Sequence, residues 1–265
     1  MQSLPLKRPK AALNLIGTHQ KLIRLSRRLV GKKLPEGIYF PSAKEIIYFE
    51  GMRGPDGLKR KCPEEKQPEH FLIPGADNGL LWGQIEDCQA NLKRALEEGN
   101  HERAAFEAAW MSHFIIDGLT PAHHYPLDDI KEEFMSESEY LEIFGKPLAR
   151  KIEGETFRET VGKNIVYYGP GGHLTKHFAF EFQIAKIVNT RKKKTLTPAL
   201  PYSLGDIKKL DFKKEFYGSV EKIADLKMYE RYKVEGWSSD LALEAKEILL
   251  PEIVKNVTIG WLKCV

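Results

Sequence analysis

The chain has 265 residues, of which 42% are hydrophobic and 29% are charged, so it can bury a core in one large domain or two small ones. Its formal net charge is +4, because 41 basic residues face 37 acidic ones, and this mild excess suits phosphate-bearing partners without requiring them. Three widely spaced cysteines (Cys62, Cys88 and Cys264) argue against a disulfide framework and against a cysteine zinc knuckle.

The amino-terminal sequence MQSLPLKRPKAALNLIG carries basic residues but only a short, broken apolar stretch. It makes a poor secretory signal, so we expect a cytoplasmic protein. No apolar run in the sequence is long enough to span a bilayer. Nothing in the sequence indicates an oligomeric state.

Apolar residues recur at helical spacing along almost the whole chain, and no alternating strand pattern is present. The first helix is expected over residues 11–30, with His19 between Leu15 and Leu22 on its apolar stripe. A loop-rich stretch follows to about residue 76, because GPDG (54–57) and IPG (73–75) are turn signals.

The next two helices are predicted from their caps. Asp77 is a candidate N-cap for a helix that ends at Gly99, and Asn100 is a candidate N-cap for the helix that carries SHFIIDGLTPAHH (112–124). The segment 125–172 is acidic and less regular, and it ends in the helix breaker YYGPGG.

Three further helices are predicted after this breaker. They span about 173–190, 212–233 and 239–263, and the last is expected to kink at Pro251. A basic run, RKKK (191–194), follows the first of them. The sequence therefore predicts an all-α protein with a single domain over residues 1–265.

Potential metal ligands lie on the apolar stripes of these helices. One face of a helix carries, at steps of four, three and four residues, Phe106, Trp110, His113 and Asp117. Because this face also carries two large aromatic residues, His113 and Asp117 are expected to point toward the interior. A lone inward histidine such as His19 is usually a hydrogen-bonded core residue, and a histidine–carboxylate pair one turn apart is often a surface ion pair.

A second inward pair makes those simpler interpretations less favoured. His177 and Glu181 repeat the pattern on another helix, and His123 lies just past a helix end. Burying an unpaired carboxylate costs roughly several kcal/mol of folding free energy, or forces the carboxylate to take up a proton. Imidazole and carboxylate ligands without thiolates suit a catalytic Zn²⁺ site.

The segment HFIIDGLTPAH (113–123) resembles the HxxxDxxxPxH motif of the zinc-dependent phospholipase C family. Single-strand-specific nucleases that share the family's fold carry a similar segment. Other segments resemble the family's remaining ligand motifs and its last helix, in the same order along the chain: THQKLI (18–23), GPDG (54–57), EHF (69–71), HFAFE (177–181) and IVKNVTIGWL (253–262).

The resemblance implies two or three zinc ions. The first ion would be held by Asp56, His70, His113 and Asp117, and the second by His123, His177 and Glu181. A third would share Asp117 with His19. In the family this third ion is also bound by an amino-terminal tryptophan exposed by processing, whereas the first tryptophan here is Trp82.

His123 and His177 are farther apart in this sequence than the resemblance to the phospholipase would lead one to expect. This implies an insert at about 125–172, which could form a lid or an extra wall of the substrate site. It also leaves open that His173 replaces His177 as a ligand.

The resemblance implies a phosphodiester hydrolase of the phospholipase C type, acting on phospholipid with a metal-activated water. Asp56 would then be both a ligand and the residue that orients or deprotonates this water. Glu181 and Leu119 favour the phospholipase, because the nucleases tend to carry aspartate and histidine at these two positions, respectively.

One alternative is a single-strand nuclease that uses the RKKK run and the aromatic residues of YYG (167–169). Another is a non-catalytic, metal-stabilised binding protein.

Overall fold

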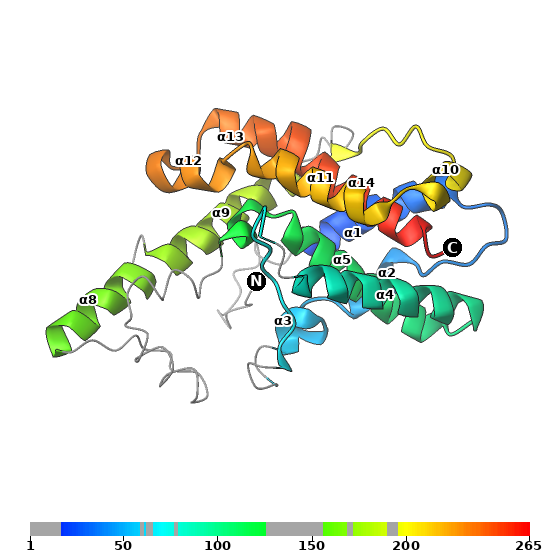
Figure 1. Cartoon of the computed structure of the whole chain (residues 1–265), viewed down its shortest axis with the longest axis horizontal. Coiled ribbons are helices and arrows are strands. Elements are labelled where there is room, and N and C mark those ends of the chain that lie inside the picture. Colours follow the sequence, from blue (N-terminus) through cyan, green and yellow to red (C-terminus); the bar gives the residue numbers. More distant parts are fainter. Residues whose placement is uncertain are drawn as a thin grey trace, which may run out of the picture.

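The structure is a computed structural model that describes residues 17–58, 61, 66–76, 79–125, 156–168, 172–189 and 196–265. Every regular element in these ranges is a helix (Figure 1), which confirms the predicted all-α fold. None of the described helices combines the length and the apolar character needed to cross a bilayer.

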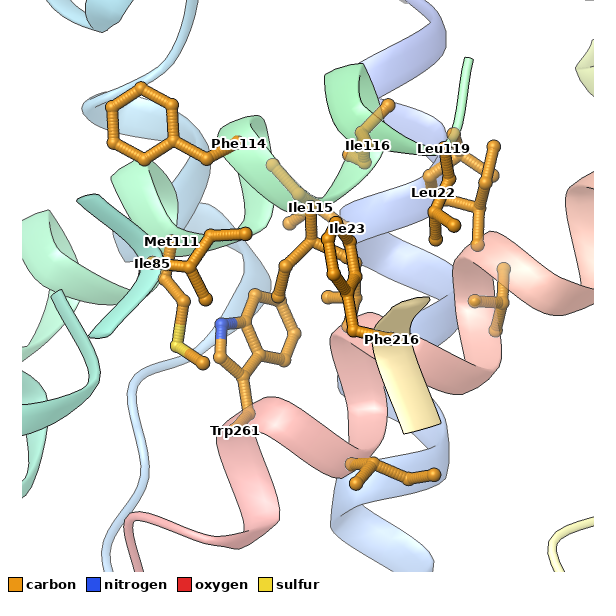
Figure 2. Packing of buried hydrophobic residues seen from close by; sticks show 14 of the residues in the cluster. Leu22, Ile23, Ile85, Met111, Phe114, Ile115, Ile116, Leu119, Phe216 and Trp261 are labelled. Atoms are coloured by element: carbon orange, nitrogen blue, oxygen red, sulfur yellow. The ribbon is translucent and has the colours of Figure 1, made fainter. Parts of the chain in front are cut away.

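The core forms where three helices far apart in sequence meet. These are α1 (Thr18–Lys33), α5 (His101–Gly118) and α14 (Leu250–Leu262), with α4 (Leu80–Glu97) packed along α5. Figure 2 shows Trp261 of α14 in one cluster with Met111 of α5 and Ile23 of α1. The indole N–H of Trp261 donates to the carbonyl of Ala108 (3.0 Å), so this buried polar atom is satisfied.

The predicted caps have different outcomes. The Asn100 side chain accepts a hydrogen bond from the backbone N–H of Arg103 (3.1 Å), which confirms it as the N-cap of α5. Asp77 lies outside the described residues, and the N-cap of α4 is Gly79. Helix α1 begins at Thr18 in the described part of the chain and ends at Lys33, slightly beyond the predicted end.

The stretch predicted as loop-rich contains short helices. They are α2 (Ala43–Tyr48), the 3₁₀ turn η2 (Gly51–Arg53) and α3 (Pro55–Leu58). A capping box between Ser42 and Glu45 begins α2. These elements are too short to produce a recognisable helical periodicity in the sequence.

One described helix, α8 (Phe157–Tyr168), lies within the long segment that separates His123 from His177. The 3₁₀ turn η4 (Pro121–His124) follows α5, and α8 and α9 (His173–Val188) extend from one end of the bundle (Figure 1). Most of the predicted insert, residues 126–155 and 169–171, lies outside the described residues, as does the RKKK run.

The carboxy-terminal part has more breaks than predicted. The single helix expected over 212–233 is wrong: α11 (Phe212–Ala224) and α12 (Met228–Glu235) are separated at Lys227, whose φ is 48°. A short helix, α10 (Leu204–Lys209), precedes them.

The last predicted helix also divides, before Pro251. It consists of α13 (Ser239–Glu244), a π-helical turn η6 (Ala245–Leu249) and α14. Proline cannot donate the usual hydrogen bond to the residue four positions earlier, and the wider π turn just before it changes the bonding register.

Candidate metal centre

All of the predicted metal ligands lie within the described residues, and the structure brings them together. They come from α1, α3, the segment before α4, α5, η4 and α9. They form three groups in which the ligand atoms lie within 4.8 Å of one another: His19, His113 and Asp117; Asp56, His70 and His113; and His123, His177 and Glu181. Their role as metal ligands remains a prediction.

Asp117 belongs to the first group and also contacts His70 of the second, and its two oxygens face different histidines. Oδ2 is 2.7 Å from His70 Nδ1 and 3.1 Å from His113 Nε2. Oδ1 is 3.2 Å from His19 Nε2. This arrangement suits a carboxylate that bridges two cations, the role that the sequence resemblance implies for Asp117.

Asp56 completes this side of the centre from α3. Its Oδ1 is 3.9 Å from His113 Nε2, and its side chain is 19% exposed, whereas those of His113 and Asp117 are almost fully buried. The following residue, Gly57, packs so closely that a Cβ there would lie 2.2 Å from the Met52 carbonyl oxygen. A glycine is therefore required for α3 to hold Asp56 at this place.

The third group is adjacent. His123 Nδ1 donates to the backbone carbonyl of His70 (2.7 Å), so its Nε2 is directed at Glu181, 2.9 Å away. His177 Nε2 is 3.3 Å from the same Glu181 oxygen. Phe71 stacks on the His123 ring with centroids 5.3 Å apart. His173 begins α9, but its side chain is outside the described ones, so it remains an untested alternative.

Sequence reasoning missed Glu50. Its Oε1 lies 2.8 Å from His113 Nδ1 and 3.2 Å from His19 Nδ1, and its side chain is 3% exposed. It precedes η2, in the stretch that was expected to be loop. The only signal in the sequence is an acidic residue directly after the apolar run IIYF, six positions before Asp56.

No known protein family matches the sequence, and neither does any curated protein. Among solved structures, it matches the crystal structure of Clostridium perfringens alpha-toxin from avian strain SWCP, with a TM-score of 0.50 and 16% sequence identity. Alpha-toxin is a zinc-dependent phospholipase C. This chain shares the all-helical fold of the matched part of alpha-toxin.

The match covers 95% of this chain and 63% of the alpha-toxin chain, so this chain spans less than two thirds of the toxin's length. At this identity the likeness establishes the fold, and the toxin's activity is a separate question. The predicted relationship to zinc-dependent phospholipases C is confirmed at the level of the fold.

The carboxylates of the centre stay ionised although they are buried. Burial alone would raise the pKa of Asp117, but the charges of His123 and His113 hold that pKa well below its usual range. Burial likewise opposes ionisation of Glu181, but hydrogen bonds from His123 and His177 hold its pKa well below its usual range. These side chains therefore carry negative charge at neutral pH.

Two histidines next to Asp117, on the side of the centre formed by the first two groups (the Asp117 side), retain protons more strongly than usual. Burial and the neighbouring His113 lower the pKa of His19, but hydrogen bonds to Asp117 and Glu50 outweigh them and raise it to about 9. Burial lowers the pKa of His113 too, yet Asp117 and Glu50 raise it well above its usual value. In the metal-free protein, protons on these rings balance the carboxylates.

The residues fit the zinc ions that the alpha-toxin fold implies. Among the described residues, Glu50, Asp117 and Glu181 form ion pairs only with histidines, and with no lysine or arginine. Within the described part of the chain, imidazolium groups supply the balancing positive charge, and cations could replace their protons. Imidazole nitrogens and carboxylate oxygens are suitable ligands for Zn²⁺.

His124 differs from the other histidines of this region. Burial lowers its pKa to about 4, and its Nε2 donates to the carbonyl of Gly118 (3.0 Å). It is thus a neutral, hydrogen-bonded core residue, consistent with its place outside the matched motif.

Proposed function

We propose that the protein is a zinc-dependent phosphodiester hydrolase of the phospholipase C type, which cleaves phospholipids between the glycerol oxygen and phosphorus. The observation that carries the proposal is the convergence of every ligand expected from the sequence, from His19 to Glu181, into three adjacent groups on an alpha-toxin fold. Short-range sequence patterns alone would not bring these segments together.

The proposal gives each group a role. Asp56, His70, His113 and Asp117 hold one ion; His123, His177 and Glu181 hold another; His19 and Asp117 contribute to a third. Bound zinc supplies charge that stabilises the phosphoryl oxygens, and it lowers the pKa of water from about 15.7 toward about 7.

Asp56 is the best-placed general base on this side of the centre, because it has the most exposed side chain of its group. In the proposed reaction its carboxylate orients a water and accepts a proton from it. The water oxygen forms a bond to phosphorus, the bond from phosphorus to the glycerol oxygen breaks, and that oxygen leaves as diacylglycerol after taking up a proton.

Two exposed phenylalanines close to the third group in sequence favour a lipid substrate. Phe178 and Phe182 each follow a predicted ligand on α9, and they are 40% and 49% exposed. Exposed rings on the helix that carries His177 and Glu181 could contact the first carbons of acyl chains.

Zinc analysis and hydrolysis of a short-chain phosphatidylcholine test the proposal. We expect at least two zinc ions per chain, release of phosphocholine, and loss of activity on chelation that zinc restores. A protein that binds zinc but cleaves no phosphodiester would be the metal-stabilised binding protein instead. A protein that binds no zinc would overturn the proposal altogether.

A second candidate is a single-strand-specific nuclease, and one observation favours it. A hollow of about 550 Å³ between α1 and α2 is lined by Gly31, Ala43, Ile47 and four basic residues (Arg24, Arg27, Arg28 and Lys44), and of these Arg27 already donates to the carbonyls of Phe40 and Pro41. The remaining basic groups could bind a phosphate backbone. Hydrolysis of single-stranded DNA that weakens steeply with salt, with phosphatidylcholine left intact, would establish this candidate. Hydrolysis of lipid with shallow salt dependence would exclude it.

A further inference from the structure

Glu50 is a buried carboxylate behind the metal centre. It lies at the junction between α2 and η2, and its side chain is only 3% exposed. Its Oε2 has no hydrogen-bond partner among the described residues. The contacts of Oε1 therefore supply most of the interactions that offset the loss of hydration of this carboxylate. Burying a carboxylate with so few partners lowers the stability of the protein, which suggests that its remaining contacts serve the function of the site.

The contacts of Oε1 are with two histidines that belong to different parts of the centre. It is 2.8 Å from His113 Nδ1 and 3.2 Å from His19 Nδ1. In both rings the opposite nitrogen, Nε2, faces Asp117, at 3.1 Å in His113 and 3.2 Å in His19. Glu50 thus lies on the outer side of both rings, and Asp117 on the inner side.

This geometry sets the tautomer that each ring would adopt on binding a metal ion. An ionised carboxylate only accepts hydrogen bonds, so the nitrogens that face Glu50 keep their protons. In the metal-free protein each Nε2 faces the carboxylate of Asp117 and can carry a proton as well; when a metal ion displaces that proton, the Nε2 lone pair is directed toward Asp117 while Nδ1 stays protonated. The negative charge of Glu50 also makes both imidazoles more basic, and therefore stronger ligands.

We propose that Glu50 is a positioning residue shared by two metal ions, holding His113 and His19 in the orientation and tautomer that direct their Nε2 atoms toward Asp117. This inference rests on the proposed zinc centre. The third group is supported differently, because His123 is held by the carbonyl of His70 and Glu50 does not contact it. Glu50 should therefore affect the Asp117 side alone.

The test is a zinc titration of the full-length protein against a competing chelator, comparing wild type with Glu50→Gln. The substitution keeps the shape of the side chain and removes its charge. We expect zinc binding on the Asp117 side to weaken by about 10–100-fold, the usual effect of losing an outer-shell partner, with the full number of ions still bound at saturating zinc. The same weakening should appear in a His177→Ala background, where the third group is disabled.

Glu107→Gln is the matched control. Glu107 is also a buried carboxylate, on α5, but it pairs with Arg103 and not with a histidine. This variant should bind zinc as the wild type does. Cobalt substitution adds a spectroscopic readout, since Glu50→Gln should shift the visible absorption of Co²⁺ while Glu107→Gln leaves it unchanged.

Three outcomes would overturn the inference alone. Wild-type affinity in Glu50→Gln would mean that the contact has no role. Loss of one ion at saturating zinc would make Glu50 a ligand and not a positioning residue, and equal weakening of all ions would indicate a general effect on the fold. A wild-type protein that binds no zinc would overturn the proposed function and this inference together, whereas the first three outcomes leave the function intact.

Discussion

The two sides of the candidate metal centre differ in what supports their histidines. On the Asp117 side, His113 and His19 belong to helices of the central core and are backed by the buried carboxylate of Glu50. On the Glu181 side, His123 is backed by a backbone carbonyl and a stacked phenylalanine, while His177 and Glu181 lie on α9 at one end of the bundle. The first side is preorganised by charge and core packing, and the second depends on where α9 lies.

Asp117→Asn should have the largest effect, because it removes charge from the residue that faces both His19 and His70. We expect loss of the ions on the Asp117 side and a decrease in kcat/KM on the order of 10³-fold or more, equivalent to several kcal/mol of lost electrostatic stabilisation. Metal analysis and hydrolysis of short-chain phosphatidylcholine measure both. His124→Ala is the control and should keep its zinc. Equal losses from the two variants would show that the motif has been matched in the wrong register.

Glu181→Gln sharpens the comparison, because it should remove only the ion of the third group. We expect about one zinc fewer per chain, with the Asp117 side still loaded, and a decrease in activity on the order of 10²-fold. Metal content after gel filtration gives the stoichiometry. If both sides lost their metal together, the two groups would have to be regarded as one cooperative site.

Gly57→Ala tests whether the backbone of α3 sets the position of Asp56. A Cβ there would lie 2.2 Å from the Met52 carbonyl oxygen, and a backbone atom cannot move aside as easily as the end of a flexible side chain. We expect a destabilisation of about 1–3 kcal/mol in denaturant unfolding and weaker zinc binding on the Asp117 side. Gly83→Ala, on α4 with nothing within 4 Å of its Cβ position, is the matched control and should be neutral or slightly stabilising. An unaffected Gly57→Ala protein would show that α3 can shift without cost.

The smallest expected effect is the pH dependence of the metal-free protein. The pKa of His19 is raised to about 9, so its contribution to stability is complete below about 6.5 and is lost as the pH rises through 9. Chelator-treated protein should therefore melt a few degrees lower at pH 9 than at pH 6.5. Saturating zinc should reduce this decrease, because bound zinc replaces the protons. A metal-free protein that became more stable over this range would contradict the assignment of protons to these rings.

The sequence by itself determined the all-α fold class, the N-cap at Asn100 and the inward histidine–carboxylate pairs on α5 and α9. These features depend on local periodicity and capping, which are properties of neighbouring residues along the chain. The ordered ligand motifs also predicted which residues converge, from His19 to Glu181. They did so through resemblance and not through any physical calculation of how the helices pack.

Only the tertiary structure decided how those residues are supported. Glu50 lies behind His113 and His19 because α1, α5 and the α2–η2 junction pack together, and no pattern within the 43–58 stretch records that contact. The His70 carbonyl that orients His123 likewise acts across segments distant in sequence. The break at Lys227 was also missed, and at Pro251 the sequence predicted a kink but not the π turn that precedes it. Long-range packing selects these backbone conformations and hydrogen bonds, and local propensity is too weak to specify them.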